Sequence, residues 1–346
     1  MLLKFDPYGI YCPQADVYID PWKPVKNAII THAHADHAKW GSENYLSHHL
    51  SVPILKFRLG DIKVQGINYG EEIVINGVRI SLHPAGHIPG SAQIRLEYKG
   101  EIWCASGDYK LQLDGISTPF EPVRCHHFVT ESTFGLPVYR FPDSQTVHHD
   151  INNWWLKNKE EEKTSVIIGY ALGKAQRIIK HLDPTIGTIY THGAVDNLNR
   201  ILEESGLELP PTQRIVSDTH KSLFKGNIVV ATPSAIGTPW MKRFNPYSIA
   251  ICSGWMQLRG TRRRKSADRG FVLSDHADWA GLNQAIKETG AENVYVTHGY
   301  KSTFARWLRE DLHINAVEVD TLYEGETLNE STTPENEIDS KDEEVR

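Results

Sequence analysis

The stretch Thr31-His32-Ala33-His34-Ala35-Asp36-His37 directly follows residues 27–30, an apolar run that predicts a buried strand. In an extended chain alternate side chains face the same way, so His32 and His34 can bind one metal ion together. Asp36 and His37 follow where the chain can turn toward a second ion. Imidazole and carboxylate without thiolate suit Zn²⁺ and are compatible with Mn²⁺ or Fe. A cluster of solvated histidines is the alternative, and the spacing argues against it.

Two metal ions need more than four ligands, and further candidates follow other predicted strands. His87 lies in a loop shaped by Gly and Pro, and Asp108 follows the run 101–105. A carboxylate at that position can bridge two ions about 3.5–4 Å apart. Alone, each residue is more often structural, but after the first motif both are predicted ligands. Asp20 is interpreted as a hydrogen-bond acceptor that orients a ligand.

Composition bounds the class of protein. The 346 residues predict about two domains, and 40% hydrophobic residues suffice for a sizeable core. No apolar run approaches the roughly 18 residues of a membrane span, and the N-terminus lacks the features of a signal peptide. The four cysteines lie far apart without a CxxC pair, which predicts neither disulfides nor a thiolate zinc site. The expected compartment is therefore the cytoplasm.

Charge is distributed unevenly along the chain. Residues 329–346 hold seven acidic and two basic side chains, so this segment carries −5 of the net charge of −6. We expect it to be a disordered acidic tail, because it has almost nothing to bury. Residues 256–270 instead carry a local +5, with six basic residues and one Asp.

The pattern of apolar residues predicts an α/β fold in which two kinds of sheet follow each other. Up to residue 130, short β-branched runs predict strands, with short helices only around 38–40 and 53–59. From residue 145, strands alternate with helices, which favours a parallel sheet. The alternation resumes after the basic segment with a strand at 271–273 and continues to residue 319.

The metal motif, followed by His87 and Gly107-Asp108, resembles the metallo-β-lactamase fold. This resemblance implies an αββα sandwich with a dinuclear metal site. Because that fold hosts several reactions, the motif alone does not select one.

Three later segments resemble the motifs of the β-CASP nucleases, which carry an α/β insert in this fold. Thr130-Glu131 resembles motif A, Ser274-Asp275-His276 motif B, and Thr297-His298-Gly299 motif C. The resemblance implies that His298 is a further metal ligand. It also implies a metallo-β-lactamase domain in residues 1–136 and 271–328, with a β-CASP domain in residues 137–270 between its two parts.

Within this superfamily the chain most resembles the bacterial ligase-associated DNA exonucleases, through segments 170–176, 253–256 and 268–279. The resemblance implies an exonuclease acting on DNA in repair, in functional association with a DNA ligase. The histidine of motif C is shared with RNA-processing relatives, so an RNA-processing nuclease is the alternative. A catalytically silent nucleic-acid scaffold is disfavoured because every expected ligand is present.

The expected reaction is hydrolysis of a phosphodiester by a hydroxide generated at two divalent cations, with Zn²⁺ favoured. We assign the ligands to two sites, with Asp36 also counted as catalytic: His32, His34, His87 and Asp108; and Asp36, His37, Asp108 and His298. His276, oriented by Glu131, is the expected general acid. The alternative for His276 is a structural or ligand histidine.

The basic segment is expected to contact phosphates of the nucleic acid, because arginine binds phosphate in a bidentate manner. A solvated surface loop is the alternative. Its candidate residues are Arg259, Arg262, Arg263, Arg264 and Lys265.

Overall fold

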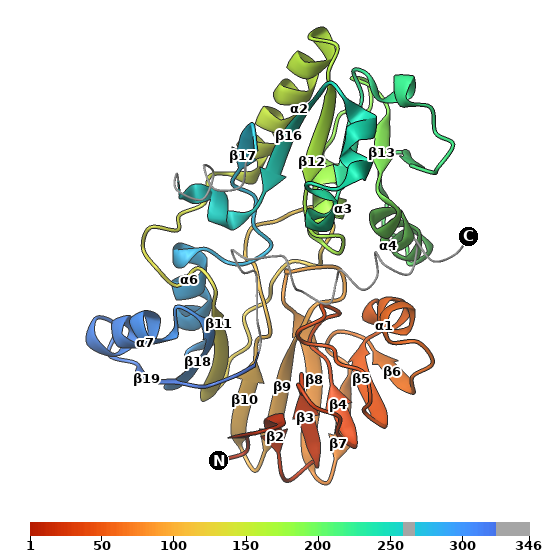
Figure 1. Ribbon diagram of the computed structural model, residues 1–346. Helices are drawn as coiled ribbons and strands as arrows, with labels where there is room; N and C mark the ends of the chain where they lie inside the picture. The colour runs from red at the N-terminus through yellow and green to blue at the C-terminus, as the bar shows by residue number, and fades with distance from the viewer. Residues whose placement is uncertain (259–266, 323–346) are drawn as a thin grey trace. The chain divides into compact units, whose positions relative to one another are not determined.

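The computed structural model describes residues 1–258 and 267–322. These residues form two units, which Figure 1 shows as ribbons. Unit 1 holds Met1–Leu113, Ser117–Arg140 and the described residues from His276 onward. Unit 2 holds Asp114–Ile116 and Phe141–Asp275. The basic residues 259–265 and the acidic tail 329–346 lie outside the described residues.

Unit 1 contains two mixed sheets. The first sheet has the strand order β1-β2-β3-β4-β5-β6. Its strands are β1 (Lys4–Asp6), β2 (Gly9–Cys12), β3 (Val17–Ile19), β4 (Asn27–Ile29), β5 (Asn44–His48) and β6 (Val64–Ile67). The second sheet has the order β19-β18-β11-β10-β9-β8-β7. Its strands are β7 (Glu72–Ile75), β8 (Val78–Pro84), β9 (Ala92–Tyr98), β10 (Glu101–Ala105), β11 (His127–Ser132), β18 (Asn293–Gly299) and β19 (Asn315–Glu318).

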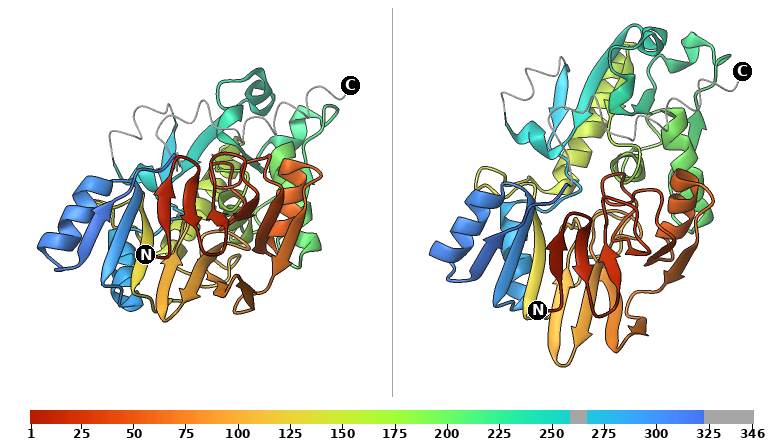
Figure 2. Two further views of the ribbon diagram at one scale, coloured as in Figure 1. Left: turned by 90° about the horizontal axis from the view of Figure 1, so that it is seen from below. Right: turned by 60° about the horizontal axis from the view of Figure 1, so that its bottom comes forward.

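The two sheets of unit 1 pack face to face. One buried cluster takes Ile19 and Ile29 from the first sheet and Leu82, Leu96 and Trp103 from the second. On the other face of the second sheet, a separate cluster joins its strands to helices α6 (Trp279–Thr289) and α7 (Lys301–Glu310), drawn in blue in Figure 2. Helix α1 (Ser51–Leu59) contacts β5 and β6. Burial of apolar surface on both faces is the main stabilising term, and it gives the expected αββα order of layers.

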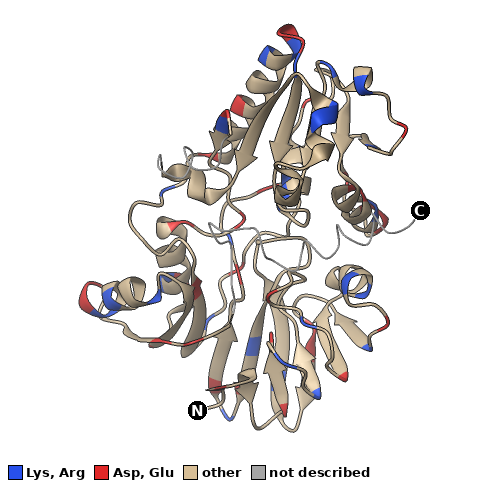
Figure 3. Ribbon diagram, in the orientation of Figure 1, with Lys and Arg blue, Asp and Glu red and all other residues tan. Residues whose placement is uncertain are grey.

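Unit 2 is built on a six-stranded sheet with every strand parallel to its neighbours, in the order β14-β13-β15-β12-β16-β17. Its strands are β12 (Thr164–Ile168), β13 (Ile189–Thr191), β14 (Thr212–Arg214), β15 (Ile228–Ala231), β16 (Tyr247–Cys252) and β17 (Arg269–Phe271). The three central strands β12, β15 and β16 carry no charged residue, as Figure 3 shows. Such apolar strands are typical of a parallel sheet that is covered on both faces.

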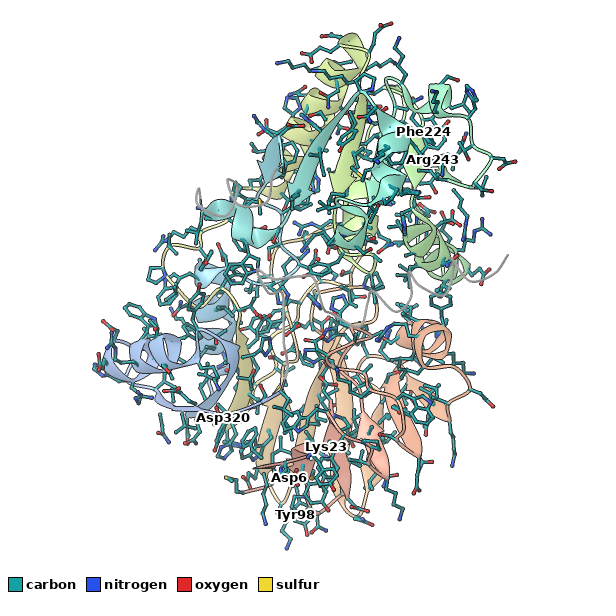
Figure 4. The ribbon with its side chains drawn as sticks, in the orientation of Figure 1. Asp6, Lys23, Tyr98, Phe224, Arg243 and Asp320 are labelled. Atoms are coloured by element: carbon teal, nitrogen blue, oxygen red, sulfur yellow. The ribbon has the colours of Figure 1, made fainter. Side chains whose placement is uncertain are left out.

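Three helices contact the strands of this sheet: α2 (Ser144–Glu160), α3 (Lys174–Lys180) and α4 (Gly193–Glu204). Asp143 caps α2, accepting a hydrogen bond from the Thr146 amide at 3.2 Å. In unit 2, the guanidinium of the half-exposed Arg243 lies over the buried Phe224 ring, 5.8 Å from its centroid (Figure 4). The expected insert with a parallel sheet is therefore confirmed.

Two segments differ from the expected local structure. Residues 38–40 form no helix: a single turn closes at the Ala38 amide, which donates to the His34 carbonyl at 2.9 Å. Beyond it, Gly41 adopts a φ of +108° and the Tyr45 hydroxyl donates to the Lys39 carbonyl, which holds the chain in an irregular loop. The strand expected at 271–273 instead spans Arg269–Phe271, because this segment pairs with β16.

No helix in residues 1–258 or 267–322 combines the length and apolar character needed to cross a membrane. The four cysteines are buried free thiols.

His48, at the end of β5, supports a prediction about acid stability. It is buried and stacked on Tyr69 with ring centroids 3.6 Å apart. Burial and the neighbouring His49 lower the pKa of His48 to about 4. An unfolded chain protonates histidine near pH 6.5, so between these values the unfolded state binds more protons and stability falls as pH falls.

Wild-type protein should lose free energy of unfolding between pH 7 and pH 4.5. We expect this loss to be about 2 kcal/mol smaller in the variant His48→Gln. Urea unfolding at both pH values measures the difference. The exposed His149, changed to Gln, is the control. If the free energy of unfolding falls equally in His48→Gln and wild type between these pH values, the prediction is contradicted.

Candidate metal centre

The site is assembled at one edge of the second sheet of unit 1. Strand β10 runs parallel to β11, and β11 runs parallel to β18, so their carboxyl ends meet at the same edge. Asp108 follows β10, Glu131 lies near the end of β11, and His298 lies near the end of β18. The topology thus brings together side chains that are up to 190 positions apart in the sequence.

Four of the predicted ligands form one group. One ligand-type atom from each of His32, His34, His87 and Asp108 lies within 4.8 Å of the others. His87 Nε2 is 3.1 Å from His34 Nδ1, and the His32 ring lies edge-on to both His34 and His87. These are the residues that sequence reasoning assigned to the first metal.

The carboxylate of Asp108 lies between this group and the remaining ligands. Its Oδ2 is 3.6 Å from His32 Nε2 and 3.4 Å from His37 Nε2. Its Oδ1 is 3.0 Å from His298 Nε2. Asp36 Oδ2 lies 3.6 Å from His37 Nε2. All seven predicted ligands therefore lie in one cluster, and the two oxygens of Asp108 face different histidines.

Burial and mutual charge set the protonation of this cluster. Burial lowers the pKa of His32 well below its usual value, and the surrounding imidazoles reinforce this effect. Burial would raise the pKa of Asp108, but His37 and His298 hold it well below the usual range. Burial would lower the pKa of His37, but Asp108 and Asp36 raise it well above normal. An anionic carboxylate among imidazoles is the donor set that divalent cations prefer.

An orphaned buried atom supports the same reading. His32 is 0% exposed, and no residue in the described part of the chain gives its Nε2 a hydrogen-bond partner. A buried polar atom without a partner costs free energy. A cation beside Asp108 would satisfy this nitrogen, so the residues fit a metal.

Asp20, which the sequence predicts to orient a ligand, contacts His37. Its Oδ2 lies 2.7 Å from His37 Nδ1, on the side of the ring opposite to the cluster-facing Nε2. Its Oδ1 accepts a hydrogen bond from the Thr31 amide at 2.7 Å, and the Thr31 hydroxyl donates to Oδ2. Contacts of this kind fix the tautomer and orientation of a metal-binding imidazole.

His276 lies beside the cluster and is paired with Glu131. Its Nδ1 is 3.0 Å from Glu131 Oε2, and its ring centroid is 4.7 Å from that of His87. The Tyr109 amide donates to Glu131 Oε1 at 2.9 Å, which holds the carboxylate in place. Asp108, Glu131 and His276 also bring one ligand-type atom each within 4.8 Å, so a ligand role for His276 remains a chemical alternative.

Sequence reasoning missed one residue that supports the metal motif. Arg58, from α1, donates a hydrogen bond to the carbonyl of Ala33 inside the motif. A lone arginine on a helix carries no local signal for such a contact. The predicted phosphate-binding residues 259–265 lie outside the described residues.

Glycines next to two of the candidate ligands permit close backbone approach. Gly86 precedes His87 with a φ of +75°, and a Cβ there would lie 2.2 Å from the Lys110 carbonyl oxygen. Gly299 follows His298 with a φ of +89°, and its Cβ would lie 2.3 Å from the Ser132 carbonyl oxygen. Both contacts are far below van der Waals distance.

We expect Gly299→Ala to destabilise the protein by more than about 2 kcal/mol, because the backbone of β11 must move to admit the methyl group. Gly100→Ala is the matched control, since Gly100 has a similar φ of +84° but nothing within 4 Å of the added Cβ. Denaturant unfolding and metal content measure both variants. Equal destabilisation in the two would show that φ strain alone matters.

Several known proteins are similar to this chain in sequence. No family model matches the chain. A probable DNA ligase of Opitutus terrae is 30% identical over 312 residues, which cover 89% of this chain and 30% of that protein. The DNA cross-link repair protein SNM1 of Arabidopsis thaliana is 26% identical over 81% of this chain and 64% of its own length. RNase aCSPSF2 of Saccharolobus solfataricus is 29% identical over 34% of this chain and 24% of that protein.

The chain thus spans less than two thirds of each of these relatives. Among solved structures, a protein of unknown function from Enterococcus faecalis V583 matches with a TM-score of 0.59. The match covers 84% of this chain and 78% of that one at 14% identity, which shows a shared fold.

The layered fold and the His/Asp cluster define a protein of the metallo-β-lactamase fold. The matches to these relatives and the inserted parallel sheet support the resemblance to the β-CASP nucleases.

Proposed function

We propose that this chain is a metal-dependent nuclease that hydrolyses phosphodiester bonds of DNA, as an exonuclease in repair. The observation that carries the proposal is the convergence of seven ligand-type side chains beside the His276–Glu131 pair. Such a combination supplies both parts of phosphodiester hydrolysis, activation of water and protonation of the leaving group.

In this proposal His32, His34, His87 and Asp108 hold one divalent ion. Asp36, His37, Asp108 and His298 hold the second, and Zn²⁺ suits both sets. When bound, two such ions lower the pKa of water and polarise the phosphate oxygens. Asp20 keeps His37 oriented through its contact at Nδ1.

His276 then serves as the general acid. Glu131 lies against Nδ1, so it holds a proton there and leaves Nε2 as the atom that delivers a proton to the departing alkoxide. The Tyr109 amide fixes Glu131, and through it the imidazole plane. Deprived of this proton, an alkoxide is a poor leaving group.

DNA is favoured as the substrate because the relatives named for DNA ligation and DNA cross-link repair match 89% and 81% of this chain. The match to the RNase covers 34%. An RNA-processing nuclease is the second candidate, favoured by the histidine at position 298. We also propose a metallo-β-lactamase domain in residues 1–136 and 271–328, which largely overlaps unit 1, and a β-CASP domain in residues 137–270, which largely overlaps unit 2. The setting proposed is cytoplasmic, alongside a DNA ligase.

The test is product analysis on end-labelled, 5′-phosphorylated oligonucleotides of matched DNA and RNA sequence, with Zn²⁺ or Mn²⁺ added. Successive loss of single nucleotides from DNA is the expected result. Preferential cutting of RNA would favour the second candidate, and internal cuts would overturn the exonuclease assignment. No cleavage of either polymer by metal-loaded protein would overturn the proposed function.

A further inference from the structure

A buried ionic cluster in unit 2 lies immediately before His276 in the chain. Lys174, the first residue of α3, and Arg177, in the same helix, are 0% and 1% exposed. Lys174 Nζ lies 3.5 Å from Asp275 Oδ2, and Arg177 Nη1 lies 3.8 Å from Asp275 Oδ1. Asp275 is itself 3% exposed.

Arg177 also holds the backbone on which Asp275 lies. Its Nη1 donates to the Ser274 carbonyl, and its Nη2 donates to Ser144 Oγ, at the start of α2, at 3.2 Å. The planar guanidinium can reach these acceptors at once, which an ammonium group cannot do. Residues 274 and 275 are thus fixed to the amino ends of two helices of unit 2.

This cluster is a costly way to stabilise a fold. Removing charges from water carries a desolvation penalty, and well-packed apolar residues of the same size often serve as well or better. Here two cations share one carboxylate, with the Tyr170 ring 4.8 Å from Lys174 Nζ as additional support. What such a cluster supplies is a defined position for the groups it binds.

The group that follows is the proposed general acid. The chain leaves unit 2 at Asp275 and enters unit 1 at His276. On the far side, the Ala277 amide donates to the Tyr109 carbonyl at 2.7 Å, and His276 meets Glu131. The backbone that carries His276 is therefore held at the residues both before and after it.

We propose that Lys174 and Arg177 are positioning residues for His276: by fixing Ser274 and Asp275, they set the backbone from which this imidazole reaches the leaving group. The inference rests on the proposed function, because it takes His276 to be the general acid. Neither cation contacts the substrate in this role.

The test separates proton delivery from every other step by changing the leaving group. A DNA oligonucleotide releases an alkoxide, which needs a proton from His276. A p-nitrophenyl ester of thymidine 5′-phosphate releases a stable phenolate, which does not. His276→Ala sets the reference signature, with turnover lost on DNA and largely kept on the ester.

Arg177→Lys keeps the positive charge but loses the planar guanidinium that reaches several acceptors at once. We expect kcat on DNA to fall about 10- to 100-fold in this variant. On the p-nitrophenyl ester, kcat should change less than about 3-fold, with KM for both substrates near wild type. Lys174→Met should show the same selectivity. Lys180→Met, on the same helix but partly exposed, is the matched control and should behave as wild type.

Melting temperature and metal content are measured for every variant. If Lys174→Met does not fold, the result for Arg177→Lys alone tests the positioning role. Equal losses on both substrates, or no loss on DNA, would overturn the positioning role. If His276→Ala loses both substrates alike, the general-acid role and this inference fail together. Failure of the proposed function would look different, because wild-type protein would then turn over neither substrate.

Discussion

Alanine in place of Asp108 is expected to reduce turnover at least about 1,000-fold and to lower the amount of bound metal. Asp108 places Oδ2 3.4 Å from His37 Nε2 and Oδ1 3.0 Å from His298 Nε2, so it faces both proposed metal sites. Its removal takes away the shared anionic ligand and leaves buried imidazoles to bind cations alone. A loss of about 4 kcal/mol of transition-state stabilisation corresponds to this factor.

Elemental analysis of protein loaded with Zn²⁺ or Mn²⁺, together with cleavage of end-labelled DNA, checks both parts of the prediction. Asp61→Ala, at an exposed carboxylate of unit 1, is the control and should keep wild-type metal content and rate. Retention of two metal ions per chain by Asp108→Ala would show that this carboxylate does not bridge them.

The ligand set could be predicted because its signal is local. His32, His34, Asp36 and His37 lie within one turn and its approach, and the residue types reveal the chemistry before any fold is known. His87, Asp108 and His298 each lie beside a glycine near a strand end, and the parallel strands β10, β11 and β18 bring the ends that carry Asp108 and His298 to one edge of the sheet. The order of His87 and Asp108 along the chain connected them to the first motif, and His298 was predicted from its resemblance to motif C of the β-CASP nucleases.

The elements that the sequence did not predict are short or polar. Strands β1 and β14 have three residues each with charged or amide side chains, and β6 contains a glycine. Their hydrophobic periodicity is too weak to indicate a strand, and pairing with a neighbour decides their conformation. The contacts of Arg58 and of the Lys174–Arg177–Asp275 cluster could not be predicted from local sequence either, because they join segments up to about 100 residues apart.

Replacement of His276 by alanine is expected to lower kcat about 100- to 10,000-fold while the metal content stays at the wild-type level. The reason is its place beside the cluster, with Nδ1 3.0 Å from Glu131 and its ring 4.7 Å from that of His87. Glu131→Gln keeps the size of the side chain but weakens the hold on the Nδ1 proton, so it should show a smaller loss in the same direction. Loss of a metal ion from His276→Ala would instead assign this histidine as a ligand, in keeping with its proximity to Asp108 and Glu131. Metal analysis and single-turnover cleavage on the same preparation separate the two roles, because a general acid slows the bond-breaking step without changing what the protein binds.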